Sequence, residues 1–198
     1  MLNSHIIATV NQRALQLLAK FCDREFYERQ IARRIGIAYG SANRALSELY
    51  STGAIKRRQE GRMFFYSIDP SNAAITEFKK LINIMLIEPL TEEFKNISSK
   101  VVLYGSCAQG VDTSGSDLDL FIVSHDKERV MEAIDSFRFP KGFEDIHIQA
   151  VVKSPVELLE AGESGQAFIE EVGRGIALWE RATDEPGVYT ERTPDLQI

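Results

Sequence analysis

The chain has 198 residues, 44% hydrophobic and 26% charged, with a net charge of −6, which is ordinary for a soluble globular protein of one large or two small domains. No apolar run approaches the ~20 residues of a membrane span, and the N-terminus lacks the basic and apolar regions of a signal peptide. The two cysteines, Cys22 and Cys107, form neither a disulfide framework nor a metal motif, so we expect a cytoplasmic protein.

The charge is unevenly distributed along the chain. Residues 1–70 contain 11 Lys and Arg against 6 Asp and Glu, a net charge of +5, and the remainder contains 12 against 23, a net charge of −11. A basic first segment on an acidic chain indicates that this segment alone meets a polyanion.

Residues 1–69 contain three predicted helices and a hairpin. Apolar residues at helical spacing predict a helix over about 5–21. A short second helix ends at Gly36, and a third opens at Ser41 and stops at Gly53, because glycine readily takes the left-handed conformation that ends a helix. Residues 54–58 and 62–68 flank a Gln-Glu-Gly turn and predict a β-hairpin.

Three helices followed by a two-stranded hairpin resemble a winged helix-turn-helix domain. The resemblance implies that the third helix enters the major groove of duplex DNA and that the hairpin meets the backbone or the minor groove. The implied base-reading residues are Ser41, Asn43 and Arg44. The implied phosphate contacts are basic residues of the hairpin and of the segment before the turn: Lys56, Arg57, Arg58, Arg62, Arg33 and Arg34. The alternative is a winged helix that docks proteins or dimerises.

Residues 70–98 are predicted to form a helical connector. Asp69 and Pro70 provide a cap and a first-turn proline, and Pro89 is expected to interrupt the helix. The segment from Ile75 to Ile87 is apolar on most sides, which indicates burial on more than one face. We therefore expect this helix to pack between two domains or against a second copy of itself in a homodimer.

The most informative stretch is residues 101–123, VVLYGSCAQGVDTSGSDLDLFIV. It predicts an apolar strand, a loop of small residues that opens with Gly105-Ser106, and a second strand. Alternate side chains of a strand share a face, so Asp117 and Asp119 point the same way while Leu118 points into a core. Paired carboxylates suit a hard divalent cation such as Mg²⁺, and a Gly-Ser turn leaves room for a phosphate.

Gly-Ser, a gap of ten residues and Asp-x-Asp between two apolar strands resemble the DNA polymerase β nucleotidyltransferase superfamily, and the form GSxAxG…SDLDL is most similar to its minimal nucleotidyltransferases. The resemblance implies an α/β (α+β) fold with a mixed sheet over residues 99–182, preceded by the small winged-helix domain. It implies that Asp117 and Asp119 hold Mg²⁺ (or Mn²⁺), that Gly105 and Ser106 hold the phosphates of an NTP, and that Ser116 orients the loop. Gln109 departs from the family, which often has a basic residue there.

The third strand of the family carries a third carboxylate, and here the matching stretch is residues 143–152. Counted from the end of that strand, the matching residue is Gln149, which is neutral. Alternation places Asp145 and His147 on the same face as Gln149. Three readings stay open: Asp145 is the third acid in another register, His147 is the base or a ligand, or the site binds nucleotide and metal without efficient transfer. The alternative to all three is that this polar face has no role in the site and is simply exposed to solvent.

The end of the chain predicts further helices. Ser154-Pro155 opens a capped helix. Residues 166–179 predict a final helix despite glycines at 173 and 175. We expect Trp179 to pack in the protein rather than to stack on a base. From residue 183 the sequence is polar and aperiodic, and residues 183–198 are expected to be a loosely held tail.

Three functions follow from these patterns. The first is a nucleotidyltransferase that moves a nucleoside monophosphate from an NTP to an acceptor hydroxyl, coupled to DNA binding. The second is a DNA-binding transcriptional regulator whose degenerate nucleotidyltransferase domain senses a nucleotide. The third is an antitoxin-type enzyme that modifies a partner protein.

Overall fold

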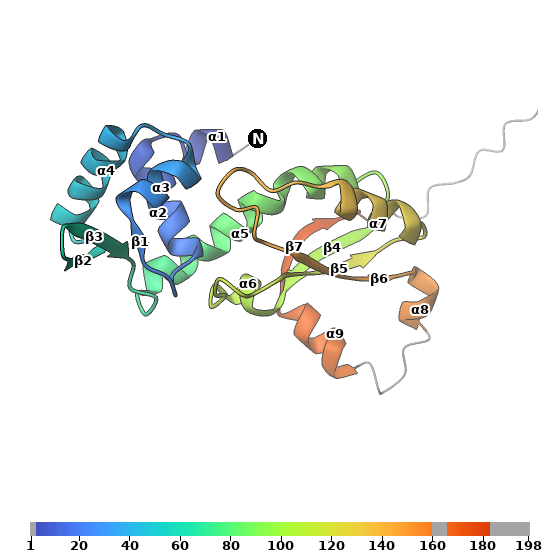
Figure 1. The fold of residues 1–198 in the computed structure, drawn as a ribbon. Helices are drawn as coiled ribbons and strands as arrows, with labels where there is room; N and C mark the ends of the chain where they lie inside the picture. The colour runs from blue at the N-terminus through green and yellow to red at the C-terminus, as the bar shows by residue number, and fades with distance from the viewer. Residues whose placement is uncertain (1–2, 160–165, 183–198) are drawn as a thin grey trace, which may run out of the picture.

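The computed structural model describes residues 3–159 and 166–182. It has an N-terminal unit of helices with a small sheet, a long helix, and a C-terminal unit on a four-stranded sheet (Figure 1). The elements in chain order are α1 (Asn3–Ile6), α2 (Val10–Lys20), β1 (Phe26–Tyr27), α3 (Glu28–Ile35), α4 (Tyr39–Ser51), β2 (Lys56–Glu60), β3 (Met63–Ser67), α5 (Ala73–Phe94), β4 (Lys100–Tyr104), α6 (Gly105–Gln109), β5 (Leu118–Val123), α7 (Lys127–Ser136), β6 (Ile148–Lys153), α8 (Pro155–Leu159), α9 (Gln166–Gly173) and β7 (Ile176–Glu180).

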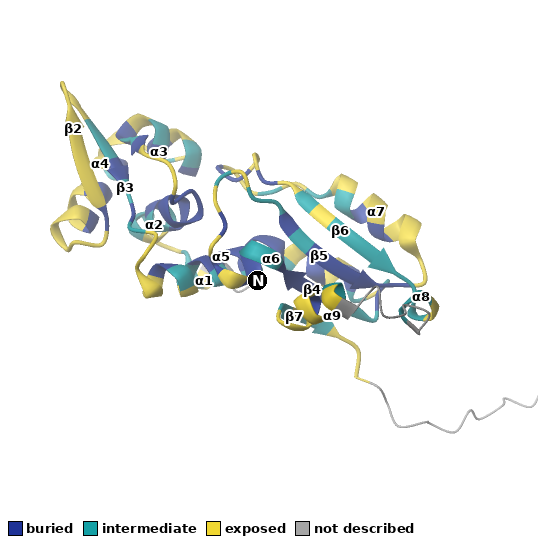
Figure 2. Cartoon of the chain, turned by 90° about the horizontal axis from the view of Figure 1, so that it is seen from below, coloured by how far each residue is buried: buried dark blue, intermediate teal, exposed yellow. Residues whose placement is uncertain are grey.

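The N-terminal unit contains the predicted hairpin. Strands β2 and β3 pair antiparallel around Gly61, whose φ of +59° suits glycine. The two-residue strand β1, which the sequence pattern did not indicate, adds to β3 and gives the order β1-β3-β2. β2 is exposed along its whole length (Figure 2). The helix α3 ends at Gly36 in the left-handed conformation, as predicted. The winged helix-turn-helix assignment itself stays a prediction.

The first predicted helix is shorter than expected. It was expected to begin near His5, but α2 begins at Val10 and α1 is a separate short helix. The reason is a capping box: the Thr9 side chain accepts a hydrogen bond from the Gln12 amide, and the Gln12 side chain accepts one from the Thr9 amide.

The connector is one helix rather than two. The expected cap at Asp69 is wrong, because α5 is capped by Asn72, which accepts from the Ala74 amide, while Asp69 accepts hydrogen bonds from Ser71. The expected interruption at Pro89 is also wrong. A proline inside a helix removes one backbone hydrogen bond, and here the fully buried side chains on both sides of it keep the helix continuous: Leu86, Ile87, Leu90 and Phe94.

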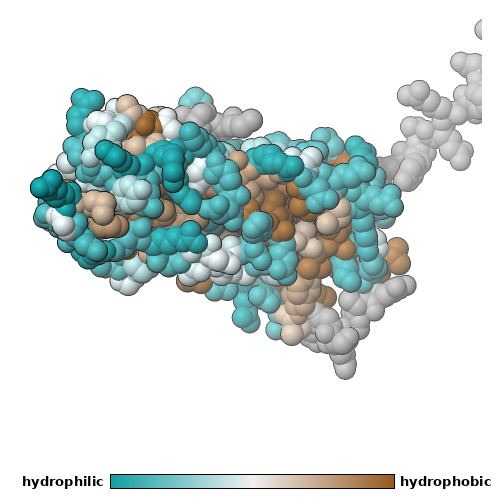
Figure 3. Space-filling view, viewed as in Figure 1, coloured by the Kyte–Doolittle hydropathy of each residue, from teal (hydrophilic) through white to brown (hydrophobic). Residues whose placement is uncertain are grey.

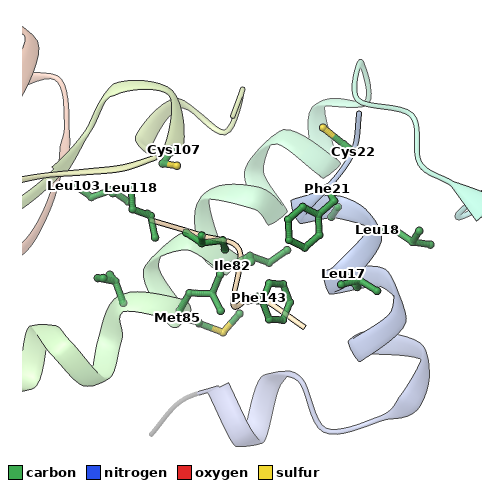
Figure 4. Close-up of a cluster of buried hydrophobic side chains, with 14 of the residues drawn as sticks. Leu17, Leu18, Phe21, Cys22, Ile82, Met85, Leu103, Cys107, Leu118 and Phe143 are labelled. Carbon is green, nitrogen blue, oxygen red and sulfur yellow. The ribbon is translucent and has the colours of Figure 1, made fainter. Parts of the chain in front are cut away.

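Helix α5 packs against both units, as its all-round apolar character predicts, with contacts to α2 on one side and to α6, α7 and β4 on the other. Phe21, directly after α2, stacks on Phe143 of the C-terminal unit at a ring-centroid distance of 6.0 Å, beside Ile82 and Met85 of α5 (Figure 4). The two units therefore share one hydrophobic core. Among the described residues, no helix has both the length and the apolarity to cross a membrane.

The C-terminal sheet has the strand order β6-β5-β4-β7. β5 and β6 are parallel, whereas β4 is antiparallel to both of its neighbours, so the predicted mixed sheet is confirmed. Leu118, Leu120 and Ile122 pack in the core that includes α5 and α7. The opposite face carries a smaller apolar cluster with Phe121 and Val172, covered by α8 and α9. Figure 3 shows that apolar side chains gather at the surface mainly over this C-terminal unit.

Two elements of this unit differ from expectation. The predicted helix over 166–179 is wrong: α9 ends at Gly173, and β7 then pairs with β4. Gly175 makes this turn possible, because a Cβ there would lie 2.5 Å from the Leu103 carbonyl oxygen. The predicted strand over 143–152 starts only at Ile148. The tail, predicted over 183–198, lies outside the described residues.

A buried polar network connects the two units through side chains of α5. The Asp112 carboxylate, fully buried, lies 2.7 Å from Lys20 Nζ and 3.5 Å from Lys79 Nζ. Lys20 also donates to Asn83 Oδ1 at 2.7 Å, and Asn83 Nδ2 donates to Asp112 Oδ1 at 3.2 Å. All four residues are at most 2% exposed. Each charge therefore depends on its partners in place of water.

Replacing Asp112, the one carboxylate of the network, should show how far the stability of the fold depends on these pairs. In Asp112→Asn, Lys20 and Lys79 lose their counter-charge inside the protein, and we expect unfolding by urea to show a loss of about 3–5 kcal/mol. The matched control is Glu92→Gln, which breaks an exposed pair with Lys95 and should cost at most ~0.5 kcal/mol. Equal losses in the two variants would contradict the importance of the network.

Candidate active site

The predicted motif folds as β4, α6, a loop and β5, at the centre of the sheet. In the antiparallel register Tyr104 lies opposite Asp119, which brings Gly105 beside that carboxylate. Gly105 has a φ of +67°, and a Cβ on it would lie 2.6 Å from Asp119 Oδ2. Only glycine fits here, because its conformation is left-handed and the carboxylate occupies the place of a side chain. Residues 105–109 form the short helix α6 where a loop was expected.

The two aspartates lie at the start of β5, both partly exposed, while Leu118 between them is fully buried. Burial raises the pKa of Asp119, and the charges of Asp117 and then Glu171 raise it further. Within residues 3–159 and 166–182, no lysine, arginine or histidine forms an ion pair with either aspartate. The pair is thus two mutually repelling acids without a protein cation.

The loop between α6 and β5 is held by its own polar groups. Ser116 Oγ accepts from the Thr113 amide at 2.9 Å, and the Ser116 amide donates to the Thr113 carbonyl at 3.1 Å. Ser106 lies in the first turn of α6, and its carbonyl accepts from the Val111 amide. Cys107 is buried, its Sγ donates to the Asp117 carbonyl at 3.2 Å, and burial raises its pKa to about 11. This thiol therefore packs in its neutral form at neutral pH.

Gln149 lies directly beside Asp119 in the parallel register of β5 and β6. It is exposed. A neutral amide thus occupies the strand position next to the acid pair. Among the described residues, no group of three or more His, Cys, Asp and Glu side chains is arranged to hold a metal ion.

The other two candidates on the third strand are placed differently from expectation. Because β6 begins at Ile148, strand alternation does not extend to Asp145 or His147. Asp145 instead pairs with Arg34 of the N-terminal unit at 2.7 Å, and a role as the third acid stays a prediction. His147 is exposed just before β6, and its carbonyl accepts from the Leu118 amide at 2.9 Å.

Helix α9 brings residues to the site that sequence reasoning assigned to packing alone. A cavity of about 340 Å³ is lined by Gly105 and Gln109 together with three charged residues of α9 and the turn after it, Glu170, Glu171 and Arg174. Phe168 holds α9 there, with ring-centroid distances of 5.6 Å to Tyr104 and 5.7 Å to Phe121.

No local signal in the sequence places α9 beside Gly105, because its position depends on the chain turning back at Gly173 and Gly175 so that β7 pairs with β4. Arg174 forms no ion pair within the described part of the chain. It supplies a positive charge to the cavity that Gln109 also lines.

Comparison with family models agrees with this geometry. Residues 85–180 match the model of the nucleotidyltransferase domain. The match runs from within α5 to the end of β7, so it includes the acid pair and α9. It supports the nucleotidyltransferase part of the resemblance and, with it, the general transfer of a nucleoside monophosphate from an NTP. It does not extend to the N-terminal unit. No curated protein and no solved structure gave a significant match.

The residues predicted to contact DNA lie in the N-terminal unit, but they differ in exposure and in the contacts that they make within the protein. On α4, Ser41 is partly buried and Arg44 is exposed, while Asn43 donates to Glu28 at 2.8 Å. In the turn of the hairpin, Arg62 is exposed, and neither it nor Arg44 has an ion pair among the described residues.

Four of the remaining basic candidates, Lys56, Arg57, Arg58 and Arg34, have partners within the protein. Arg57 stacks between Tyr50 and Phe64, 4.1 and 4.5 Å from their ring centroids. Arg58 forms ion pairs of 2.7 Å with both Glu25 and Glu60, and Lys56 pairs with Asp69. Arg34 pairs with Asp145 and donates to the Gly142 carbonyl of the C-terminal unit, and its role at phosphates stays a prediction.

The contact between Gly105 and Asp119 can be tested by comparing alanine substitutions at Gly105 and at Gly115, a second glycine of the same motif. Gly105→Ala places a methyl group against the carboxylate in a left-handed conformation, and we expect a loss of at least about 1 kcal/mol in unfolding free energy. Gly115→Ala is the control, since its Cβ meets nothing within 4 Å, and it should be neutral or stabilise by up to ~1 kcal/mol. Thermal and urea unfolding of both variants measure the difference.

Proposed function

We propose that this protein is a Mg²⁺-dependent (or Mn²⁺-dependent) nucleotidyltransferase that moves a nucleoside monophosphate from an NTP to an acceptor hydroxyl, coupled to a DNA-binding N-terminal domain. The observation that carries the proposal is the contact of Asp119 with Gly105, with Asp117 close enough to raise the pKa of Asp119. Two repelling carboxylates at a glycine turn have no role in packing, whereas they suit a metal with a phosphate.

The donor set fits a hard divalent cation. Asp117 and Asp119 offer carboxylate oxygens at a partly exposed position, and no lysine or arginine of the described segments pairs with them. Mg²⁺ prefers one or two carboxylates, with water and phosphate oxygens completing its shell. These two residues would hold the metal. Bound there, it would neutralise charge on the phosphates and favour in-line displacement.

The protein's own residues would then bind and orient the nucleotide. Gly105 and Ser106 lie at the turn beside the acids and would hold the phosphates. Arg174 lines the same cavity as Gly105, so we assign it to the charge of the triphosphate, in place of the basic residue that Gln109 does not provide. Ser116 keeps the loop folded through Thr113.

A specific observation favours a second candidate function. Gln149 beside Asp119 leaves the acid pair without a third carboxylate on the sheet, and a neutral amide is a poor metal ligand and base. This arrangement suits a regulator in which the domain binds nucleotide and metal without efficient transfer.

A labelling experiment separates the two functions. Incubation with labelled NTPs, Mg²⁺ and cell extract should label an acceptor, and Asp117→Asn should lower the yield by at least about 100-fold if the carboxylate acts on the metal. Gln149→Asp should raise turnover, because it adds a carboxylate beside Asp119. NTP binding without transfer in the unaltered protein would favour the regulator, and a labelled protein acceptor would favour the antitoxin-type enzyme. Loss of activity in Gln149→Asp would contradict the inferred role of position 149.

DNA binding has its own test, which uses the difference between free and paired arginines. Affinity for duplex DNA should fall with salt, with a slope of about −0.9 per phosphate contacted. Arg44→Ala and Arg62→Ala should each weaken binding and reduce the slope by about 1, whereas Arg58→Ala should do less because Glu25 and Glu60 already pair with it. Arg129→Ala, at an exposed position of α7 in the C-terminal unit, is the control. Binding that does not respond to salt would point to a protein-docking domain.

A further inference from the structure

The loop that leads to the acid pair is held by the N-terminal unit at its surface as well as through the buried network. Asp23, three residues after the end of α2, accepts hydrogen bonds from the Ser114 amide at 2.9 Å and from Ser114 Oγ at 2.7 Å. Partial burial raises the pKa of Asp23, but the hydrogen bonds from Ser114 outweigh it, so the pKa lies below its ordinary value. The carboxylate is therefore an ionised acceptor at neutral pH.

Ser114 lies close to the two aspartates in the sequence, so its hydrogen bonds to Asp23 also restrain the backbone that carries them. It lies within the turn that the Thr113 and Ser116 hydrogen bonds form, and Asp117 follows directly. Cys107 holds the Asp117 carbonyl from the other side. A shift of Ser114 therefore moves the backbone from which Asp117 projects.

A second contact from the N-terminal unit holds the segment that leads into β6. Arg34 donates to the Gly142 carbonyl at 3.0 Å and pairs with Asp145 at 2.7 Å. The segment that it holds leads to His147, whose carbonyl accepts from the Leu118 amide between the two aspartates. The N-terminal unit thus contacts both segments that approach the acid pair.

We propose that Asp23 is a positioning residue for the metal-binding aspartates, so that the N-terminal unit forms part of the framework of the active site. This inference rests on the proposed function, because it concerns the metal and nucleotide expected at Asp117 and Asp119. It assigns a role to a residue outside residues 85–180, the part of the chain that matches the nucleotidyltransferase family.

The experiment uses the full chain with the variants Asp23→Ala, Asp23→Asn and Ser114→Ala. In Asp23→Ala we expect faster amide hydrogen exchange at residues 113–117 and, by Mn²⁺ titration with electron paramagnetic resonance in the presence of a nonhydrolysable NTP analogue, an affinity about 10-fold weaker, as for other groups that orient metal ligands. Asp23→Asn keeps an acceptor for the Ser114 amide and should restore most of the affinity. In the double variant of Asp23→Ala and Ser114→Ala the losses should be less than additive, because both remove the same contact.

Glu25→Ala is the matched control, since Glu25 is exposed two residues further on and pairs with Arg58 inside the N-terminal unit. It should leave exchange and Mn²⁺ affinity unchanged. Unaltered protein that binds no Mn²⁺ would overturn the proposed function itself. Binding in the unaltered protein that is the same in Asp23→Ala, or is weakened equally by Glu25→Ala, would overturn only the role of Asp23.

Discussion

The structure depends on one buried carboxylate. Asp112 lies without solvent contact between Lys20 of α2 and Lys79 of α5, and Asn83 completes its hydrogen bonds. The attraction between buried charges offsets their loss of water only when each has its partner at short distance. The three segments that carry these residues must therefore meet in one arrangement. Because Asp112 belongs to the loop between α6 and β5, this requirement sets where that loop runs.

The same loop ends at the acid pair, where a second constraint acts. Asp119 contacts Gly105 so closely that no side chain fits there, and its charge is opposed by Asp117 and Glu171. Such a concentration of negative charge is unfavourable for folding and is typical of a site that binds a cation. Asp119 lies on β5, which pairs with β4 on one side and β6 on the other, and Asp117 directly precedes that strand. Gln149 and Arg174 distinguish this site from one built on three strand carboxylates.

The N-terminal unit and the C-terminal unit are joined more tightly than two domains on a linker. They share a hydrophobic core through Phe21 and Phe143, and they exchange hydrogen bonds at Asp23 and Arg34. Interfaces between loosely linked domains are smaller and more polar, and relative motion is expected there. The contacts of Asp23 and Arg34 with the loop before the acid pair and the segment before β6 are a physical route for the proposed coupling between DNA and nucleotide.

Sequence by itself determined the acid pair, the glycine beside it and the hairpin, because strand alternation and glycine turns are properties of a few neighbouring residues. The mixed sheet followed from the resemblance to the nucleotidyltransferase superfamily. It did not determine that Pro89 stays inside α5, that residues 176–180 form a strand, or that Asp145 turns to Arg34. Each of these depends on partners far away in the chain: burial of Leu90 and Phe94, pairing with β4, and a charge on another unit. The position of α9, and with it Glu171 and Arg174, was decided only by tertiary packing, because its apolar residues fit a core helix equally well anywhere on the sheet.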